Sequence, residues 1–172
     1  LQSFAQRYAF KVENTPSVLC HSQRVSSTKI RTFLAQGAFS QASQMLGRDF
    51  AICGKIIHGK QLGRTIDFPT INIPIKRNVS PVLGVFAVQV QLLGKTFNGV
   101  CNIGNRPTVN GENILLEVFL FNFKQTVYGE FANVIFKQQI REEQKFDSFE
   151  QLKEQIKLDV GIAKDFFQQA LN

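Results

Sequence analysis

The sequence is short of cysteine, histidine and acidic residues, and these shortages exclude several classes of protein. Its 172 residues include three cysteines, two histidines, and 13 Asp and Glu against 20 Lys and Arg. Cys20, Cys53 and Cys101 show no metal-ligand spacing and cannot all pair, which favours a reducing compartment over a secreted disulfide scaffold. We therefore expect a cytoplasmic protein.

Long apolar runs, internal repeats and low-complexity segments are also missing. The longest uncharged stretch, residues 78–94, contains Pro81, two glycines and two glutamines, so it is too polar and too interrupted to span a bilayer. With 44% hydrophobic residues, the chain can bury a core, which excludes disorder. Because it begins at Leu1 and has no signal-peptide pattern, we expect a soluble piece of a longer polypeptide.

The basic excess is unevenly distributed along the chain. The net charge is +7, and residues 1–48 contain six Lys and Arg with one acidic residue, a net charge of +5, whereas residues 49–172 carry only +2. An excess of this size suits nucleic acid, an anionic membrane or a phosphate-bearing ligand. The total charge by itself leaves these three open.

The first 46 residues have the pattern of loops and short helices. Ser27 is expected to cap a helix over residues 28–36, and Ser40 to open a second helix that ends at Gly47.

From residue 50 onward the pattern is that of antiparallel strands. Apolar and polar residues alternate over 86–92, a turn follows at Gly94, and a second apolar run covers 97–103, which predicts a hairpin. Further strands are expected over 115–123 and 130–140. Several antiparallel strands at this spacing predict a small barrel or sandwich.

The chain closes with a predicted helix. Ser148 and Gln151 have the spacing of a capping box. The residues after them are apolar at every third or fourth position up to Ala170, which predicts a face packed against the sheet.

The segment richest in chemical groups is residues 54–72, which includes Gly59, Lys60, Gly63 and Arg64. A glycine-rich loop between strands can bring backbone N–H groups and positive charge close to a polyphosphate. It is not a Walker loop, because no Gly-Lys-Ser/Thr closes it. On this pattern alone, a glycine-rich hairpin with solvated cations is an equally good interpretation.

Two positions further along could hold a cation or move a proton. Thr70 and Asn72 lie on one side of an extended strand and offer neutral oxygen ligands to a hard cation, although an Asx or Thr turn would use the same residues. Glu117 has Leu115, Phe119 and other apolar residues at two-residue spacing. A carboxylate against apolar surface could accept a proton from a substrate hydroxyl, but many such residues are simple edge-strand charges.

Together and in this order, these motifs resemble the riboflavin kinase family, specifically the C-terminal kinase module of bacterial bifunctional riboflavin kinase/FMN adenylyltransferases (FAD synthetases). The resemblance covers about residues 50–170. It is carried by Gly-Arg-Thr-x-x-Phe-Pro-Thr-x-Asn at 63–72, Gly84-Val85-Phe86, residues 102–108, Glu117, Tyr128-Gly129 and residues 141–146, then Leu152, Gln155-Ile156 and Asp159.

The resemblance implies a mainly β fold, a six-stranded antiparallel Greek-key barrel with a C-terminal helix, and transfer of the ATP γ-phosphoryl group to the riboflavin 5′-hydroxyl, giving FMN. It implies that Thr70 and Asn72 hold Mg²⁺ and that Glu117 is the catalytic base. The implied ATP-binding residues are Gly59, Lys60, Gly63, Arg64, Thr65, Pro69, Thr70 and Asn72. The implied flavin-binding residues are Asn102, Arg106, Arg141, Glu143, Lys145, Phe146, Leu152 and Asp159, with residues 141–146 as a flap.

Residues 1–48 resemble the end of the FMN adenylyltransferase module, and residues 49–172 the kinase domain. The late nucleotide motif of that module corresponds to Ser26, Ser27, Thr28 and Arg31. Its early histidine motif is absent, since the only histidines are His21 and His58. The resemblance therefore implies a missing N-terminal adenylyltransferase module in cis, and a chain that makes FMN without making FAD. Most of the basic excess then belongs to the adenylyltransferase tail.

Four positions depart from the family pattern: Asp67 replaces a glycine, Phe119 a polar residue, Asn122 an aspartate and Glu142 a proline. None of them removes a residue assigned to metal binding or proton transfer, so we expect an active kinase. One alternative is a basic small barrel that binds nucleic acid, disfavoured because the aromatic residues have the pattern of a core. Another is a flavin-binding remnant without turnover, motivated by Asp67.

Overall fold

The computed structural model describes the chain apart from residues 14–15, 60–67, 76–78, 109–110 and 171–172, and apart from the side chains of 106–113. Six strands form one antiparallel sheet in the order β3-β8-β5-β6-β7-β4. Their bounds are β3 Ala51–Lys55, β4 Thr70–Ile75, β5 Gly84–Leu92, β6 Lys95–Thr108, β7 Gly111–Leu120 and β8 Phe131–Arg141. The helices are α1 Gln2–Tyr8, α2 Ser27–Ala35, α3 Phe39–Leu46 and α5 Phe149–Gln169.

The sheet has Greek-key topology and closes on itself. Strands β5, β6 and β7 follow one another, and β8 returns to lie beside β5, which is the spatial order of a Greek key. The two edges approach each other just beyond the end of β3, where the Ile57 N–H donates to the Asn72 carbonyl oxygen of β4 at 2.8 Å. The predicted mainly β, six-stranded Greek-key barrel with a C-terminal helix is therefore confirmed, including the predicted hairpin between β5 and β6.

The barrel interior is filled by alternate residues of the strands. Phe86, Ile103, Leu116, Val118 and Phe136 are each at most 2% exposed. Because successive strand residues point to opposite faces, their neighbours in sequence face outward. Leu115, Glu117 and Phe119 accordingly lie on the outer face of β7, between interior residues.

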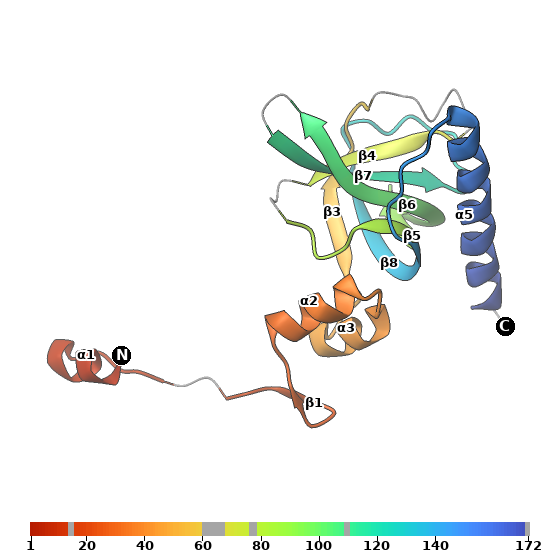
Figure 1. Ribbon diagram of the computed structural model, residues 1–172. Coiled ribbons are helices and arrows are strands. Elements are labelled where there is room, and N and C mark those ends of the chain that lie inside the picture. Colours follow the sequence, from red (N-terminus) through yellow and green to blue (C-terminus); the bar gives the residue numbers. More distant parts are fainter. Residues whose placement is uncertain (14–15, 60–67, 76–78, 109–110, 171–172) are drawn as a thin grey trace.

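Helix α5 covers part of this outer face (Figure 1). Val160, Ala163 and Phe167 of the helix pack in one buried cluster with Val85 and Val100 of the sheet, as the apolar spacing predicts. The helix begins as expected, with the Ser148 hydroxyl accepting a hydrogen bond from the backbone N–H of Gln151 at 3.2 Å. The reciprocal bond of the box is shifted by one residue, because the Gln151 side chain accepts from the N–H of Asp147.

Helices α2 and α3 close one end of the barrel (Figure 1). Leu34, Phe39 and Ala42 are buried in the same core as the strand residues. The ring of Phe39 lies 5.7 Å from that of Phe86 and 5.9 Å from that of Phe136, measured between ring centroids. These helices therefore share their core with the barrel, and a domain boundary between residues 48 and 49 stays a prediction.

The helix starts in this region differ from those expected. The N-cap of α2 is Ser26, one residue before the expected Ser27, because Ser26 is the residue in extended conformation whose hydroxyl accepts from Lys29 N–H at 3.3 Å. Helix α3 begins at Phe39 without a side-chain cap, so Ser40 lies inside it. Packing of Phe39 into the barrel end outweighs the capping preference. Gly47 ends α3 in the left-handed conformation, as expected.

The first 25 residues form elements that the sequence patterns did not predict. Helix α1 has no buried residue, and a two-stranded ribbon pairs β1 Leu19–Cys20 with β2 Gln23–Arg24. Figure 1 shows both lying away from the barrel. Across the described residues, no helix is long and apolar enough to cross a membrane.

The β5–β6 turn supports a stability prediction. Its two central residues, Leu93 and Gly94, have φ of 51° and 71°, as a type I′ turn requires, and Leu93 is 51% exposed. Leucine is strained in this conformation, whereas asparagine adopts it readily. We expect Leu93→Asn to raise the free energy of unfolding by about 0.5–1 kcal/mol in urea denaturation. The same substitution at exposed Leu158, inside a helix, is the control, and equal or lower stability of Leu93→Asn would contradict the argument.

Candidate active site

Four of the predicted site residues lie in one row across the sheet. The backbone register pairs Asn72 of β4 with Glu117 of β7, and Glu117 with Asn102 of β6. Asn102 pairs with Val85 of β5, which pairs with Arg141 of β8. Residues paired in this way in antiparallel strands point to the same face. Residues far apart in sequence therefore meet on the outer face that α5 partly covers.

A cavity of about 670 Å³ lies between this face, helix α5 and the segment that joins β8 to α5. We call it the larger cavity. Seven of the eight expected flavin-binding residues line it: Asn102, Arg141, Glu143, Lys145, Phe146, Leu152 and Asp159. The eighth, Arg106, has a side chain outside the described part of the structure. The expected base, Glu117, also lines it.

One wall of the larger cavity is aromatic. Phe68 and Phe119 meet edge to face with ring centroids 5.2 Å apart, and Phe119 packs in the same way on Phe121 at 6.0 Å. Phe119, which departs from the family pattern, therefore contributes apolar surface beside Glu117. Cys101 also borders the cavity, and burial raises the pKa of its thiol, so that it stays protonated. The wall suits a flat aromatic ligand.

Three elements meet at the far side of the larger cavity. Arg141 ends β8, Asp159 lies in α5, and their side chains form an ion pair with Nη2 and Oδ2 2.8 Å apart. Phe146, in the segment between them, lies under the Arg141 guanidinium at 5.6 Å. The structure thus joins two residues that the sequence suggested separately as flavin ligands.

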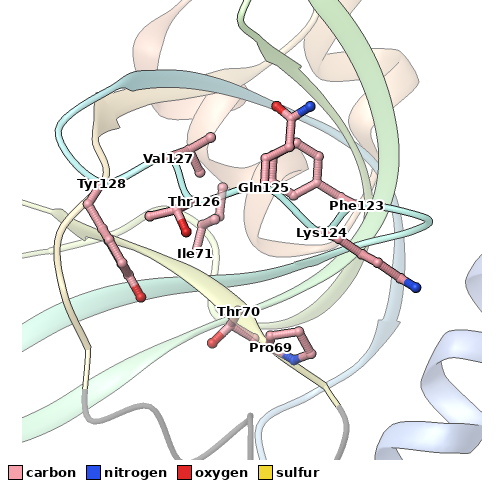
Figure 2. Close-up of a pocket in the computed structure, with 9 residues that line it drawn as sticks. All are labelled: Pro69, Thr70, Ile71, Phe123, Lys124, Gln125, Thr126, Val127 and Tyr128. Carbon is pink, nitrogen blue, oxygen red and sulfur yellow. The ribbon is translucent and has the colours of Figure 1, made fainter.

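A second, smaller cavity of about 480 Å³ borders the start of β4. Figure 2 shows it between Pro69, Thr70 and Ile71 and the segment that follows β7. That segment contributes Phe123, Lys124, Gln125, Thr126, Val127 and Tyr128. Thr70 borders both cavities. It is therefore the point at which ligands in the two cavities would approach each other.

The glycine-rich loop begins directly against Asn72. A Cβ atom at Gly59 would lie 2.5 Å from the Asn72 Nδ2 and 2.7 Å from its Oδ1, so only glycine fits there. Asn72 is 5% exposed, and its amide nitrogen donates to the Thr70 carbonyl at 3.3 Å. Because the amide nitrogen makes this bond, the other end of the Asn72 side chain is the amide oxygen, which is an acceptor. Lys60, Gly63, Arg64, Thr65 and the departing Asp67 lie outside the described residues.

The residues that resemble the adenylyltransferase motif lie elsewhere. Ser26 caps α2, and Ser27, Thr28 and Arg31 are exposed on its first turns. Neither cavity includes any of the four among its described lining residues.

Comparison with protein families identifies the family to which most of the chain belongs. The family model described as Flavokinase: Riboflavin kinase matches residues 46–167, which is most of the chain. The chain belongs to the riboflavin kinase family. The matched range contains β3 to β8 and nearly all of α5, together with both cavities.

Curated relatives extend the match beyond the riboflavin kinase unit. A bifunctional riboflavin kinase/FMN adenylyltransferase from Haemophilus influenzae is 50% identical over 168 residues, and one from Escherichia coli is 45% identical over the same length. Each match covers 97% of this chain and 54% of the relative, so the chain spans about half the length of these proteins.

A solved structure matches over a similar range. It is described as a macrolide-efflux protein from Streptococcus pneumoniae, with a TM-score of 0.76 and 31% identity. The match covers 95% of this chain and 54% of that one.

Several residues around the two cavities were missed from the sequence. Phe68 and Phe119 were not proposed as site residues, nor was the 123–128 segment. The signal for that segment was its place directly after the strand that carries Glu117, followed by the Tyr128-Gly129 pair. Its contact with β4, which makes it a cavity wall, depends on the pairing of β4 with β7, two strands far apart in sequence.

Proposed function

We propose that this chain is a riboflavin kinase, which transfers the γ-phosphoryl group of Mg-ATP to the riboflavin 5′-hydroxyl and gives FMN and ADP. The single observation that carries the proposal is the position of Thr70 on the rim of both cavities, on the strand next to the one that bears Glu117. A nucleotide in the smaller cavity and a flavin in the larger one would meet there. Phosphoryl transfer depends mainly on such positioning.

The larger cavity suits the flavin. Its volume of about 670 Å³ is in the range of small-molecule sites, and it combines an aromatic wall with a few polar groups. The flat isoalloxazine ring would lie against Phe68 and Phe119, and the ribityl chain would extend along the row of paired residues toward Thr70. Asn102 and Glu143 would hydrogen-bond the polar edge of the ligand.

Glu117 acts as the general base in this proposal. As the riboflavin 5′-oxygen forms its bond to the γ-phosphorus, the hydroxyl proton passes to the Glu117 carboxylate. The bond between the γ-phosphorus and the β,γ-bridging oxygen breaks, and ADP leaves. Glu117 is half-buried beside Phe119 on the face that lines the larger cavity, which suits a carboxylate that must reach a bound hydroxyl.

Thr70 and Asn72 are the residues that would hold Mg²⁺. The described residues contain no group of three or more His, Cys, Asp and Glu that could bind a metal, so a site here depends on neutral oxygens. The Thr70 hydroxyl and the Asn72 amide oxygen fit, because Mg²⁺ takes oxygen ligands and obtains much of its negative charge from substrate phosphates. Bound there, the ion would neutralise charge on the nucleotide phosphates. The Gly59–Thr65 loop, Lys60 and Arg64 included, would cover those phosphates.

We further propose that FAD synthesis belongs to the rest of the longer protein. The relatives of this chain are about twice its length and are named for both activities. The helix that carries Ser26 and Arg31 would complete the nucleotide site of an N-terminal FMN adenylyltransferase module. The present chain then makes FMN and no FAD.

The test is a discontinuous assay of the chain with riboflavin and excess Mg-ATP, read by chromatography. We expect FMN and ADP in equal amounts, no FAD, and no product when EDTA removes the metal. Thr70→Val keeps the side-chain shape and loses the hydroxyl, so the Mg²⁺ concentration for half-maximal rate should rise on the order of tenfold or more. Thr96→Val, at an exposed position of the β5–β6 hairpin, is the control and should match the parent chain.

Two results would overturn the kinase proposal. Quenching of flavin fluorescence without FMN formation would favour a flavin-binding remnant. Absence of flavin binding, together with nucleic-acid binding that weakens steeply with salt, would favour a basic binding module.

A further inference from the structure

Arg141 and Asp159 form a two-pronged ion pair at the edge of the larger cavity. The Arg141 Nε donates to Asp159 Oδ1 at 3.0 Å and to Oδ2 at 3.1 Å, and its Nη2 donates to Oδ2 at 2.8 Å. The Asp159 side chain is 3% exposed and that of Arg141 18%. Such a forked pair fixes orientation as well as distance.

The same guanidinium also holds the segment between β8 and α5. We call residues 142–146 the flap segment. Its first residue, Glu142, accepts a hydrogen bond at its carbonyl oxygen from Arg141 Nη1 at 2.9 Å. Its last residue, Phe146, lies under the guanidinium at 5.6 Å. One side chain therefore contacts both ends of the flap segment and connects it to α5.

Gln155 completes the set of partners around Asp159. It lies one turn earlier in α5, and its Nε2 donates to Asp159 Oδ1 at 3.0 Å. The single Nε–H of Arg141 is shared between the two oxygens, so the carboxylate receives three N–H groups in all, from Nε and Nη2 of Arg141 and from Nε2 of Gln155. With its side chain 3% exposed, the Asp159 carboxylate is held by these two neighbouring side chains, and direct contact of Asp159 with the flavin stays a prediction.

The flap segment also rests closely on the sheet. A Cβ atom at Gly84 would lie 3.2 Å from the Cα atom of Glu142, and one at Gly104 would overlap the Glu143 carboxylate. Both strands thus carry glycine where the flap segment approaches their backbone. The flap segment is held from two sides, by the sheet through these glycines and by α5 through Arg141.

We propose that Asp159 and Gln155 are positioning residues which act through Arg141 to hold the flap segment over the larger cavity. The proposal rests on the proposed riboflavin kinase function and assigns these two residues to retention of the flavin ring. They act on the affinity for riboflavin and leave the phosphoryl-transfer step to Glu117, Thr70 and Asn72.

Two variants test the proposal. Asp159→Asn removes the negative charge of the side chain at nearly constant shape. Gln155→Leu removes only the hydrogen bond from Gln155 and leaves the Arg141–Asp159 ion pair in place, so it tests the proposal even if Asp159→Asn folds poorly. Both should raise the KM for riboflavin about tenfold or more, with kcat within about threefold and the KM for ATP unchanged, as expected for loss of uniform binding to one substrate. The control is Lys157→Ala, which removes an exposed ion pair with Glu154 on the same helix.

A second measurement reads the flap segment without turnover. Lys145 is exposed within it, so the rate of tryptic cleavage after Lys145, followed by mass spectrometry, reports its release. We expect several-fold faster cleavage at this bond in both variants and no change in Lys157→Ala. Unchanged cleavage, a fall in kcat at constant riboflavin KM, or an equal rise in both KM values would overturn the proposal. If the parent chain makes no FMN, the proposed function fails, and cleavage still decides the role of Asp159 and Gln155.

Discussion

Replacing Glu117 by glutamine is expected to lower kcat for FMN formation by about 10²–10⁴-fold, the usual contribution of a general base. Glutamine keeps the size and hydrogen-bonding reach of the side chain but cannot accept the hydroxyl proton. Glu117 lies between Asn72 and Asn102 in the row of paired residues, so the substitution should leave the KM values for riboflavin and ATP nearly unchanged. Steady-state kinetics with both substrates measure the effect.

The matched control is Glu130→Gln. Glu130 is exposed in the turn before β8 and lines neither cavity, so this variant should retain the activity of the parent chain. Thermal unfolding of both variants establishes that any loss is chemical. A folded Glu117→Gln chain with full kcat would show that another group takes the proton.

Replacing Phe39 by alanine is expected to lower the free energy of unfolding by about 3–5 kcal/mol, as for other buried phenylalanines. Phe39 is 5% exposed and packs on Phe86 and Phe136 at the end of the barrel. Because these partners belong to β5 and β8, the substitution creates a cavity within the main core of the barrel. Urea denaturation followed by circular dichroism measures the change.

The control for this prediction is Phe4→Ala. Phe4 is 56% exposed in α1, where its ring stacks on that of Tyr8, so its removal should change stability by less than about 0.5 kcal/mol. A decrease of less than about 1 kcal/mol for Phe39→Ala would mean that α3 can leave the barrel at little cost.

Deletions extend the same argument to the domain boundary. Removing residues 1–25 takes away only the elements that lie apart from the barrel, and stability should be retained. Removing residues 1–48 also takes away Leu34, Phe39 and Ala42 from the core, and the barrel should be markedly destabilised. Equal stability of the two shortened chains would instead support an independent kinase domain that begins at residue 49.

Local patterns were sufficient where neighbouring residues decide the structure. Alternation over 86–92 predicted β5, and the Ser148–Gln151 pair predicted the start of α5. The predicted start of α3 was wrong because Phe39 packs on the rings of Phe86 and Phe136 from distant strands, and no local sequence pattern contains this contact. Likewise, Leu93 enters the β5–β6 turn in a conformation that leucine disfavours, because the pairing of the two strands requires it there.

The candidate site also has features that the sequence predicts and features that depend on the tertiary structure. Thr70, Asn72 and Glu117 could be selected from residue type and spacing, because their chemistry belongs to single side chains. The register that places Asn72 beside Glu117 and Glu117 beside Asn102 depends on how three strands pair. The aromatic wall of Phe68 and Phe119 depends in turn on that pairing and on the entry into β4.

The sequence by itself indicated the family through the order of its motifs, and it predicted the β5–β6 hairpin and the C-terminal helix, because these follow from residue types at fixed spacings. Only the tertiary structure decided that Arg141 and Asp159 bind each other, since the pair joins the end of β8 to the middle of α5. It also decided that Thr70 borders two cavities, because the pairing of β4 with β7 sets Thr70 opposite Phe119 and brings the segment after β7 beside the start of β4. Contacts between distant segments arise from packing of the whole chain, which short-range patterns do not specify.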